Sequence, residues 1–408
     1  MNFIDIQEHY KIVLEEKIKK IKNGSKIKVA FFISQQQLWC GKTVYNELQK
    51  SEYFEPIIVA FPNLENKIEN KIKTCTDNYN FFNNQSMNVI FGYDIEKDEF
   101  YNYEKVKADI VFFDQPYPRL PEELRWPKIY KESLVCYIPY GYKVGNLKQD
   151  HFNMELHNSC WTIFAESLWH KEQFIQYGPL GGKNVVVSGY PKFDEYNDKE
   201  IKKCNIWKIP KHKPYNIIKK VIWAPHWTVG ENILNYSTFD KYYKFFLELA
   251  TKNKDISWVL KPHQRLKHYI TEIGFMSEQE ANSYFNTWNN LDNSIYYNDS
   301  NYMDIFKTSD ALITDCGSFL AEYLPTKKPI IHLINEKSVG YNELGEKLTD
   351  SYYKIYNVED LETTINNVIL SENDYLKDTR LSNLYIVIPN SSGAGKYIVD
   401  YFIDKLVK

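Results

Sequence analysis

Short apolar runs alternate along this chain with longer stretches in which apolar residues recur at helical spacing. In the first half, the runs rich in Val, Ile and Phe predict buried strands at residues 26–34, 56–61, 108–113, 133–138, 162–165 and 184–188. The second half repeats the scheme at 220–223, 256–260, 311–313 and 329–333, with a helix at 239–253. This alternation predicts an α/β protein of two doubly wound, Rossmann-like domains.

The chain length of 408 residues also favours two domains, because single cores rarely grow beyond about 250–300 residues. We expect an N-terminal domain at 1–200 and a second domain at 217–385. A stretch rich in Lys, Pro and Asn, residues 201–216, is the linker candidate. The closing segment, 386–408, holds an amphipathic helix at 395–407 that we expect to cross back to the first domain.

Composition excludes several classes of protein. The net charge of −3 removes the electrostatic case for binding nucleic acid. The six cysteines are scattered without a CxxC pair, which argues against a disulfide framework or a zinc site and suits a reducing cytoplasm. No apolar run approaches the roughly 18–20 residues of a membrane span. We therefore expect a cytoplasmic protein.

The first 23 residues combine regularly spaced Ile, Val and Leu with several lysines. Charges interrupt the apolar pattern throughout, so this stretch is not a signal peptide. It predicts an amphipathic helix with two alternative roles. The helix either packs on its own domain, which we favour, or contacts the anionic inner face of the plasma membrane as a peripheral anchor.

Residues 304–323 form the most informative stretch of the sequence. A short helix and a buried strand at 311–313 lead into a polar turn that opens into another helix. The turn carries Thr314, Asp315, Gly317 and Ser318, which we interpret as hydroxyls, an N-cap carboxylate and a permissive glycine. Such a turn at a strand end suits a phosphate-bearing ligand. An ordinary capped strand-to-helix turn is the equally weighted alternative.

Two further predicted strands of the second half end in basic and imidazole side chains. His226 follows the strand at 220–223, and Lys261, His263 and Arg265 follow the strand at 256–260. Parallel strands would bring these groups and the 314–318 turn around one crevice. Positive and hydrogen-bond-donating groups together suit a diphosphate.

Two other features are ambiguous. Glu322 lies two helical turns beyond Asp315, where it could reach a ribose hydroxyl or remain a solvated or salt-bridged helix residue. Residues 391–396 (SSGAGK) superficially resemble a phosphate-binding loop but lack its GxxxxGK[ST] spacing. We interpret them as a turn and N-cap.

Strand ends in the first half carry less charge, which suits a hydroxyl-rich acceptor better than a nucleotide. The acceptor-side candidates are Gln36, Tyr140, Lys143 and His151. A general base that activates an acceptor hydroxyl would be Asp114, His151 or His157, and the sequence does not separate these three candidates. The sequence has no HxH, HExxH or DxD pattern, so we expect neither a metal site nor a cofactor.

Several of these segments together resemble the CDP-glycerol glycerophosphotransferase family, which includes teichoic acid primases and polymerases. Residues 187–194 (VSGYPKFD) resemble the family's G-x-P-R-x-D segment, and 222–227 (IWAPHW) are similar to its YAPTW strand end. Residues 261–263 (KPH) look like its HP turn, 312–318 (LITDCGS) resemble LITDYSS, and 393–402 are similar to its closing helix. The resemblance covers roughly residues 185–405 and implies the GT-B architecture, with His263 on the donor phosphates.

The chain departs from the family pattern in two places. The family's first domain carries WHGTPLK, whose histidine is the presumed acceptor base, whereas residues 137–143 here read YIPYGYK. In the donor loop, Gly317 and Ser318 stand where the family has two serines. The first departure leaves the acceptor and its base unassigned.

The resemblance implies a metal-independent GT-B transferase of bacterial surface-polymer assembly. It would move glycerol phosphate or a related polyol phosphate from a CDP-linked donor to a glycan, polyol or lipid-linked acceptor, in capsule, teichoic acid or lipopolysaccharide synthesis. His226 and His263 would act at the donor phosphates in the second domain. Two alternatives remain: a GT-B nucleotide-sugar glycosyltransferase, and a catalytically silent protein that binds a glycan or a partner.

Overall fold

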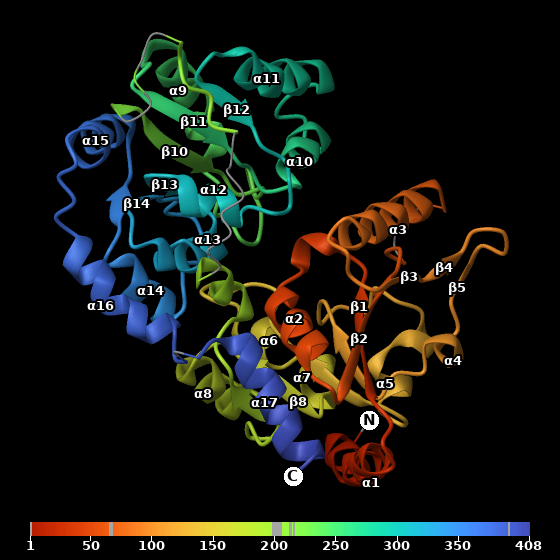
Figure 1. Cartoon of the computed structure of the whole chain (residues 1–408). Coiled ribbons are helices and arrows are strands. Elements are labelled where there is room, and N and C mark those ends of the chain that lie inside the picture. Colours follow the sequence, from red (N-terminus) through yellow and green to blue (C-terminus); the bar gives the residue numbers. More distant parts are fainter. Residues whose placement is uncertain (1, 65–67, 198–205, 212–213, 215–216, 391) are drawn as a thin grey trace. The chain divides into compact units, whose positions relative to one another are not determined.

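The computed structural model describes residues 2–64, 68–197, 206–211, 214, 217–390 and 392–408. The chain divides into two compact units, which are described separately (Figure 1). The first unit comprises Met1–Tyr142, Leu147–Glu195 and Ile386–Lys408, and the second comprises Lys143–Asn146 and Tyr196–Tyr385. Residues 201–205, 212, 213, 215 and 216 of the predicted linker lie outside the described residues.

The first unit is built on a parallel sheet whose strand order reverses at its centre. In the described residues the sheet has seven strands in the order β3-β2-β1-β6-β7-β8-β9. Their bounds are β1 Ile27–Ile33, β2 Phe54–Ala60, β3 Val89–Phe91, β6 Ile110–Phe113, β7 Leu134–Tyr137, β8 Thr162–Ala165 and β9 Val185–Val187. A hairpin of β4 (Tyr93–Asp94) and β5 (Glu99–Phe100) stands apart from it. The reversal falls between β1 and β6, which pair directly.

Helices cover both faces of this sheet (Figure 1). They are α1 Phe3–Lys22, α2 Lys42–Lys50, α3 Ile68–Asn83, α4 Tyr103–Val106, α5 Trp126–Ile129, α6 Lys148–Phe152, α7 Glu155–Ser159, α8 Leu168–Tyr177 and α17 Ala394–Leu406. Aromatic side chains join the layers. Phe31 stacks on Phe112 across β1 and β6 with ring centroids 4.9 Å apart, and Phe402 of α17 lies 6.0 Å from Phe112. Burial of such rings is the main favourable contribution to this core.

The second unit repeats the plan with a shorter sheet. Among the described residues it has six strands in the order β12-β11-β10-β13-β14-β15. The strands are β10 Lys219–Ala224, β11 Ile256–Leu260, β12 Ser294–Tyr296, β13 Ala311–Thr314, β14 Ile330–Leu333 and β15 Tyr353–Ile355. The helices are α9 Phe239–Lys252, α10 Leu266–Glu272, α11 Glu278–Asn290, α12 Met303–Thr308, α13 Gly317–Glu322, α14 Glu343–Thr349, α15 Val358–Thr364 and α16 Lys377–Val387. Trp223 stacks on Phe246 of α9 at 4.1 Å and anchors the core.

The predicted fold class is confirmed: two doubly wound α/β sheets, with the last helix returning to the first unit. There α17 packs on α2 and α1. The N-terminus of α17 is capped by Asp194, whose carboxylate accepts hydrogen bonds from the backbone N–H groups of Ala394 (2.8 Å) and Gly395 (2.7 Å). The stretch that superficially resembles a phosphate loop is therefore a turn and helix start, filled by a carboxylate of the chain itself. Residue 391 lies outside the described residues.

Gly395 permits close packing of α17 on α2. A Cβ atom at this position would lie 2.7 Å from Thr43 Oγ1 and 2.8 Å from the Thr43 carbonyl carbon. We expect Gly395→Ala to destabilise the protein by about 1–3 kcal/mol, because the backbone of α2 must move to admit the methyl group. Thermal unfolding measures the effect, with the exposed neighbour Lys396→Ala as the control. Equal stability of the two variants would contradict this packing.

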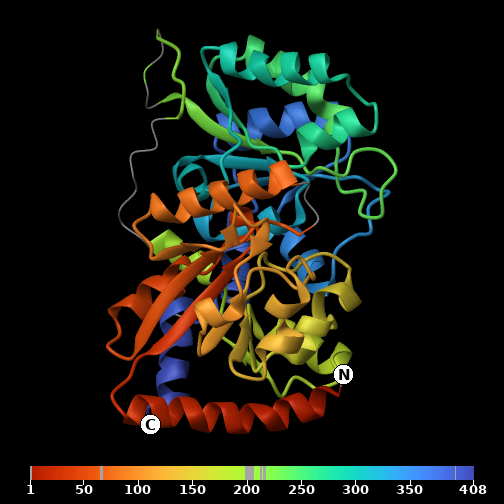
Figure 2. The same cartoon turned by 90° about the vertical axis from the view of Figure 1, so that its right-hand side faces the viewer.

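The N-terminal amphipathic helix packs on its own unit along one edge (Figure 2). Its buried face is formed by Ile6, Tyr10 and Val13. Lys17 and Lys20 form ion pairs with the buried Asp109 at 3.4 and 2.5 Å, which removes two lysines from the solvated face. The packed alternative is therefore the one observed. Among the described helices, none has the length and apolarity that crossing a bilayer requires.

Candidate functional site

The site predicted in the second unit lies at the carboxyl ends of three adjacent strands. β10 pairs with β11 on one side and with β13 on the other, in parallel. His226 follows β10, and His263 follows β11. The two imidazole ring centroids are 5.3 Å apart. Ligands of open α/β sheets bind at this edge, beside the point where strand order reverses.

Local hydrogen bonds set the tautomer of His226. The Thr228 hydroxyl accepts backbone N–H groups from Tyr236 (3.0 Å) and Ser237 (3.3 Å), so its own O–H donates to His226 Nδ1 at 2.9 Å. The Thr228 N–H also points at Nδ1, at 3.4 Å. Because Nδ1 is an acceptor, the proton of the neutral ring lies on Nε2.

His263 is oriented in the same way. Its Nδ1 accepts the backbone N–H of Arg265 at 3.2 Å, which leaves Nε2 as the protonated nitrogen. Burial and the cations Lys261 and Arg265 lower the pKa of His263 to about 3. Burial, and then His263, holds the pKa of His226 well below its ordinary value. Both rings are neutral at pH 7, and within the described part of the chain neither Nε2–H has a hydrogen-bond partner.

Two cations flank the imidazoles. Lys261 is buried, and its Nζ lies 6.0 Å from the centroid of the Tyr302 ring. Arg265 is exposed, and its guanidinium stacks on the indole of Trp227 at 4.1 Å. Stacking of this kind restricts a long side chain and holds its donors in a defined direction.

The role expected for Asp315 as an N-cap is wrong. The N-cap of α13 is Cys316, with no side-chain capping bond. The Asp315 carboxylate instead accepts the backbone N–H of His226 (2.5 Å) and both the N–H and hydroxyl of Thr238 (2.6 and 2.7 Å). It therefore fixes the loop that carries His226. Burial raises the pKa of Asp315 to about 6, against the opposing effect of these hydrogen bonds.

The other residues of this turn are placed as follows. The Thr314 hydroxyl donates to the carbonyl of Ala224 (2.6 Å) and accepts the N–H of Cys316 (2.9 Å), so it is engaged within the loop. Gly317 has no positive φ, and a Cβ there would make only ordinary 3.6 Å contacts, so the expectation of a permissive glycine is wrong. Ser318 is partly exposed in the first turn of α13.

Glu322 is not a solvated helix residue. It is buried on α13, and its carboxylate accepts a hydrogen bond from the Tyr302 hydroxyl. The Tyr196 hydroxyl donates to its backbone carbonyl at 2.5 Å. Glu322 thus orders the helix that follows the turn at 314–318, and a ribose contact stays a prediction.

Asp114 occupies the position in the first unit that Asp315 occupies in the second. Each follows the strand that pairs with the first strand of its sheet, where strand order reverses. Asp114 accepts the Ser34 N–H (2.7 Å), the Ser34 hydroxyl (3.0 Å) and the Gln35 N–H (2.9 Å), all on Oδ2. Burial raises its pKa to about 6. Oδ1 has no partner among the described residues, so the carboxylate can both hold the loop and accept a proton.

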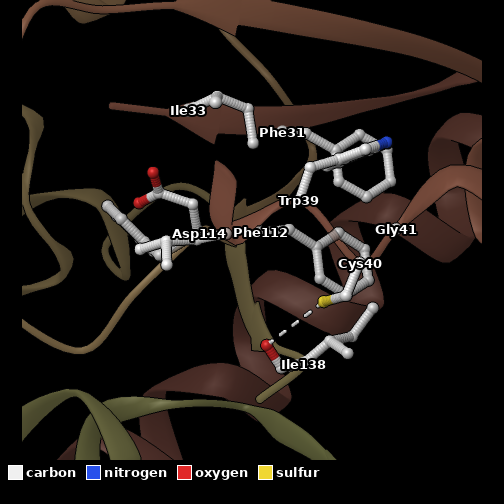
Figure 3. Close-up of a pocket in the computed structure, with 10 residues that line it drawn as sticks. Phe31, Ile33, Trp39, Cys40, Gly41, Phe112, Asp114 and Ile138 are labelled. Atoms are coloured by element: carbon white, nitrogen blue, oxygen red, sulfur yellow. Dashed lines mark hydrogen bonds between the residues drawn. The ribbon is translucent and has the colours of Figure 1, made fainter. Parts of the chain in front are cut away.

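A small cavity lies beside Asp114 (Figure 3). The rings of Phe31, Trp39 and Phe112 gather on one side of it, and the Asp114 carboxylate lies at the other end. The space open to the centre of a water molecule is about 20 Å³, enough for about one water and too little for a polyol. This cavity does not hold the acceptor.

The remaining acceptor-side candidates are dispersed. Gln36 donates its N–H to Asn78 at 2.9 Å, and its buried Oε1 has no partner among the described residues. Tyr140 follows β7, and burial raises its pKa. His151 lies on α6. Lys143 belongs by its contacts to the second unit, where its carbonyl accepts from Asn342 at 3.0 Å, so its placement in the first domain is wrong. His157 is buried, and its Nδ1 accepts the Met154 N–H.

Sequence reasoning missed a buried pair at the end of β8. Glu166 and His170 are both almost fully buried, with Oε1 3.8 Å from Nε2. Both Glu166 oxygens lack a hydrogen bond among the described residues. A carboxylate directly after the apolar run at 162–165 could have indicated the pair. The described residues hold no group of three or more His, Cys, Asp or Glu arranged as metal ligands.

The raised pKa of Asp315 has a consequence for stability. Its pKa is higher in the folded than in the unfolded state, so the stability it contributes is present below about pH 4 and is lost as pH rises through 6. We expect wild type to lose about 2–3 kcal/mol relative to Asp315→Asn between pH 4 and pH 7. Denaturant unfolding of both proteins across this range measures the difference. If the stabilities of the two proteins changed in parallel with pH, the raised pKa of Asp315 would be contradicted.

Comparisons with known structures establish the fold class. A variant of the wall teichoic acid polymerase TagF aligns with 15% identity over 98% of each chain, with a TM-score of 0.59. UDP-GlcNAc 2-epimerase from Neisseria meningitidis, bound to UDP-GlcNAc, aligns with 14% identity over 93% of this chain and 100% of that chain, with a TM-score of 0.55. At these identities the likeness concerns the fold, which is GT-B.

A family is indicated by the amino-acid sequence. Residues 150–350 match the model of the CDP-Glycerol:Poly(glycerophosphate) glycerophosphotransferase family. This segment, about half of the chain, is thus similar to a family of transferases, and the resemblance drawn from the motifs is confirmed there. No curated protein sequence matches the chain.

Proposed function

We propose that the chain transfers glycerol phosphate, or a related polyol phosphate, from a CDP-linked donor to a hydroxyl of a glycan or polyol acceptor in cell-surface polymer assembly. The family assignment over residues 150–350 supports the reaction class. The acceptor oxygen would form a bond to the β-phosphorus of the donor while the bond from that phosphorus to the CMP oxygen breaks.

The pair of Nε2–H groups on His226 and His263 carries the proposal. Two neutral imidazoles lie 5.3 Å apart and present the same nitrogen as donor, each fixed by a hydrogen bond to Nδ1. Donors fixed before the ligand arrives need no reorganisation when charge develops on a leaving phosphate oxygen. We assign both histidines to the donor diphosphate.

The cations complete the donor side of the proposal. Lys261 and Arg265 supply positive charge to the diphosphate, and Arg265 can bind two oxygens at once. Ser318 offers a partly exposed hydroxyl. Thr314 and Asp315 act by shaping the loop, and Glu322 by ordering α13 behind it.

On the acceptor side we assign the base to Asp114. A carboxylate with a pKa near 6 and one oxygen without a partner in the described residues is suited to take the proton of an acceptor hydroxyl. It would replace the histidine that the family motif has and residues 137–143 lack. Gln36, Tyr140 and His151 remain candidate contacts to the acceptor, and membrane contact of α1 remains a prediction.

Calorimetric titration with CDP, UDP and GDP tests the donor assignment. We expect heat of binding with CDP, and weaker or no binding with the other two nucleotides. A preference for UDP would favour a nucleotide-sugar glycosyltransferase. Absence of binding for all three would favour a silent glycan- or partner-binding protein. Either result would refute the proposal.

A further inference from the structure

The first unit holds a second, open pocket of about 630 Å³ that the donor and acceptor assignments do not use. It is lined by Phe3, Asn153, Glu155, Asn158, Gln176 and Tyr177. These residues come from the start of α1, the end of α6, helix α7 and the end of α8. The chain enters β8 after α7 and β9 after α8, so the pocket lies at the amino ends of the strands. Asp114 lies at the carboxyl ends.

Helix α1 is fixed beside this pocket. The Gln7 side chain donates to the carbonyl of Cys160 at 2.9 Å, and the Tyr10 hydroxyl donates to the carbonyl of Ser159 at 2.7 Å. Both carbonyls lie at the end of α7. These bonds place Phe3 at the pocket rim, where the start of α1 reaches the segment around α7 (Figure 2).

The polar wall of the pocket is preorganised. Asn158 is only 5% exposed, and its Nδ2 donates to Asn153 Oδ1 at 2.9 Å. Asn153 in turn donates to Gln149 Oε1 at 2.9 Å. Asn158 Oδ1 has no partner among the described residues, although the side chain is buried and lines the pocket. This amide oxygen can therefore accept a hydrogen bond from solvent or from a ligand in the pocket.

Gly178 ends α8 beside that oxygen. Its φ of −88° is open to any residue. A Cβ atom at this position would lie 2.8 Å from the carbonyl oxygen of Phe174, so packing on the end of α8 favours glycine here. The same Cβ atom would be in ordinary contact with Asn158 Oδ1, at 3.7 Å.

We infer that this pocket binds a neutral saccharide unit. Its groups match one: the oxygens of Asn158 and Glu155 accept sugar hydroxyls, and the Gln176 amide can both donate and accept. The rings of Phe3 and Tyr177 line the pocket and supply apolar surface, and Lys148 Nζ lies 5.9 Å from the centroid of the Tyr177 ring. Glu155, whose other oxygen accepts from Trp126 at 3.2 Å, disfavours an anionic ligand such as a phosphate. The site would hold a sugar of a glycan away from the reacting hydroxyl.

Saturation-transfer NMR with the methyl glycosides of glucose, galactose, mannose and N-acetylglucosamine tests the inference on the full chain. We expect transfer to at least one glycoside, unchanged by an excess of CDP. Tyr177→Ala should weaken binding about tenfold and Gln176→Ala about fivefold. Tyr385→Ala, which removes a tyrosine that is 87% exposed in the second unit, is the matched control and should bind as wild type does.

The outcomes separate this site from the donor site. No transfer to any of the four glycosides would overturn the inference, as would an affinity that Tyr177→Ala leaves unchanged or transfer that CDP abolishes. Thermal unfolding of each variant establishes that it is folded. CDP binding is measured separately. Failure of CDP binding would therefore leave the result on glycoside binding unaffected, and failure of glycoside binding would leave the donor assignment unaffected.

Discussion

Transfer from CDP-glycerol is expected to fall by a factor of about 10²–10³ when His263 is replaced by alanine. The substitution removes one of two fixed Nε2–H donors and also the Nδ1 acceptor of the Arg265 N–H, whereas the His263 N–H still donates to the Pro225 carbonyl at 2.9 Å. The loss should appear in kcat more than in KM, because the donor acts on charge that develops in the transition state. Initial rates of CMP release measure it.

His268 provides the matched control for this prediction. It lies on α10, five residues further along, with a side chain that is 82% exposed. We expect His268→Ala to turn over as wild type does. Wild-type turnover of folded His263→Ala, or an equal loss in both variants, would remove His263 from the donor site.

Replacing Asp315 by alanine is expected to destabilise the protein by about 3 kcal/mol or more. The buried N–H groups of His226 and Thr238 and the Thr238 hydroxyl would lose their common acceptor, and each unpaired buried group costs about 1–3 kcal/mol. The same change frees the loop that carries His226. Turnover should therefore fall even at temperatures where the variant is folded.

Asp240→Ala is the control for this second prediction, because Asp240 is exposed in the first turn of α9. Differential scanning calorimetry of both variants gives the comparison. A melting temperature of Asp315→Ala within the error of the control would show that the carboxylate does not hold the loop. Normal turnover in a destabilised Asp315→Ala variant would show that the loop that carries His226 does not contribute to catalysis.

Most of the fold could be predicted from apolar runs. The run at 256–260 coincides with β11, and the run at 26–34 contains β1, because these strands are buried on both faces and read as continuous apolar segments. The edge strands β3, β12 and β15 were missed. Each has only three residues, and β3 reads Val-Ile-Phe, an apolar run too short to distinguish a strand from other structure.

The site was predictable as a location but not in its details. Polar residues after β10, β11 and β13 do lie together, since parallel strands end at one edge. The partners of Asp315 could not be read from local sequence, because they lie 77 and 89 residues earlier in the chain. A local capping pattern was the simpler interpretation, and long-range contacts overrode it.

The two units place equivalent aspartates at equivalent points. Asp114 and Asp315 each tie the loop after the first strand of a sheet to the end of a neighbouring strand, and burial raises both pKa values to about 6. A carboxylate at the point of strand reversal is thus a structural element of both sheets. In the first unit, Oδ1 of Asp114 has no hydrogen-bond partner among the described residues, and the proposed role of Asp114 as the base uses this oxygen.

The identity of the released nucleotide tests the central claim most directly. Purified protein is incubated with CDP-glycerol or a UDP-sugar and a membrane fraction as the acceptor, and the products are separated by chromatography. Attack at the β-phosphorus releases a nucleoside monophosphate, whereas glycosyl transfer releases a nucleoside diphosphate. We predict acceptor-dependent release of CMP from CDP-glycerol. Release of UDP from the UDP-sugar, with no CMP from CDP-glycerol, would contradict the account.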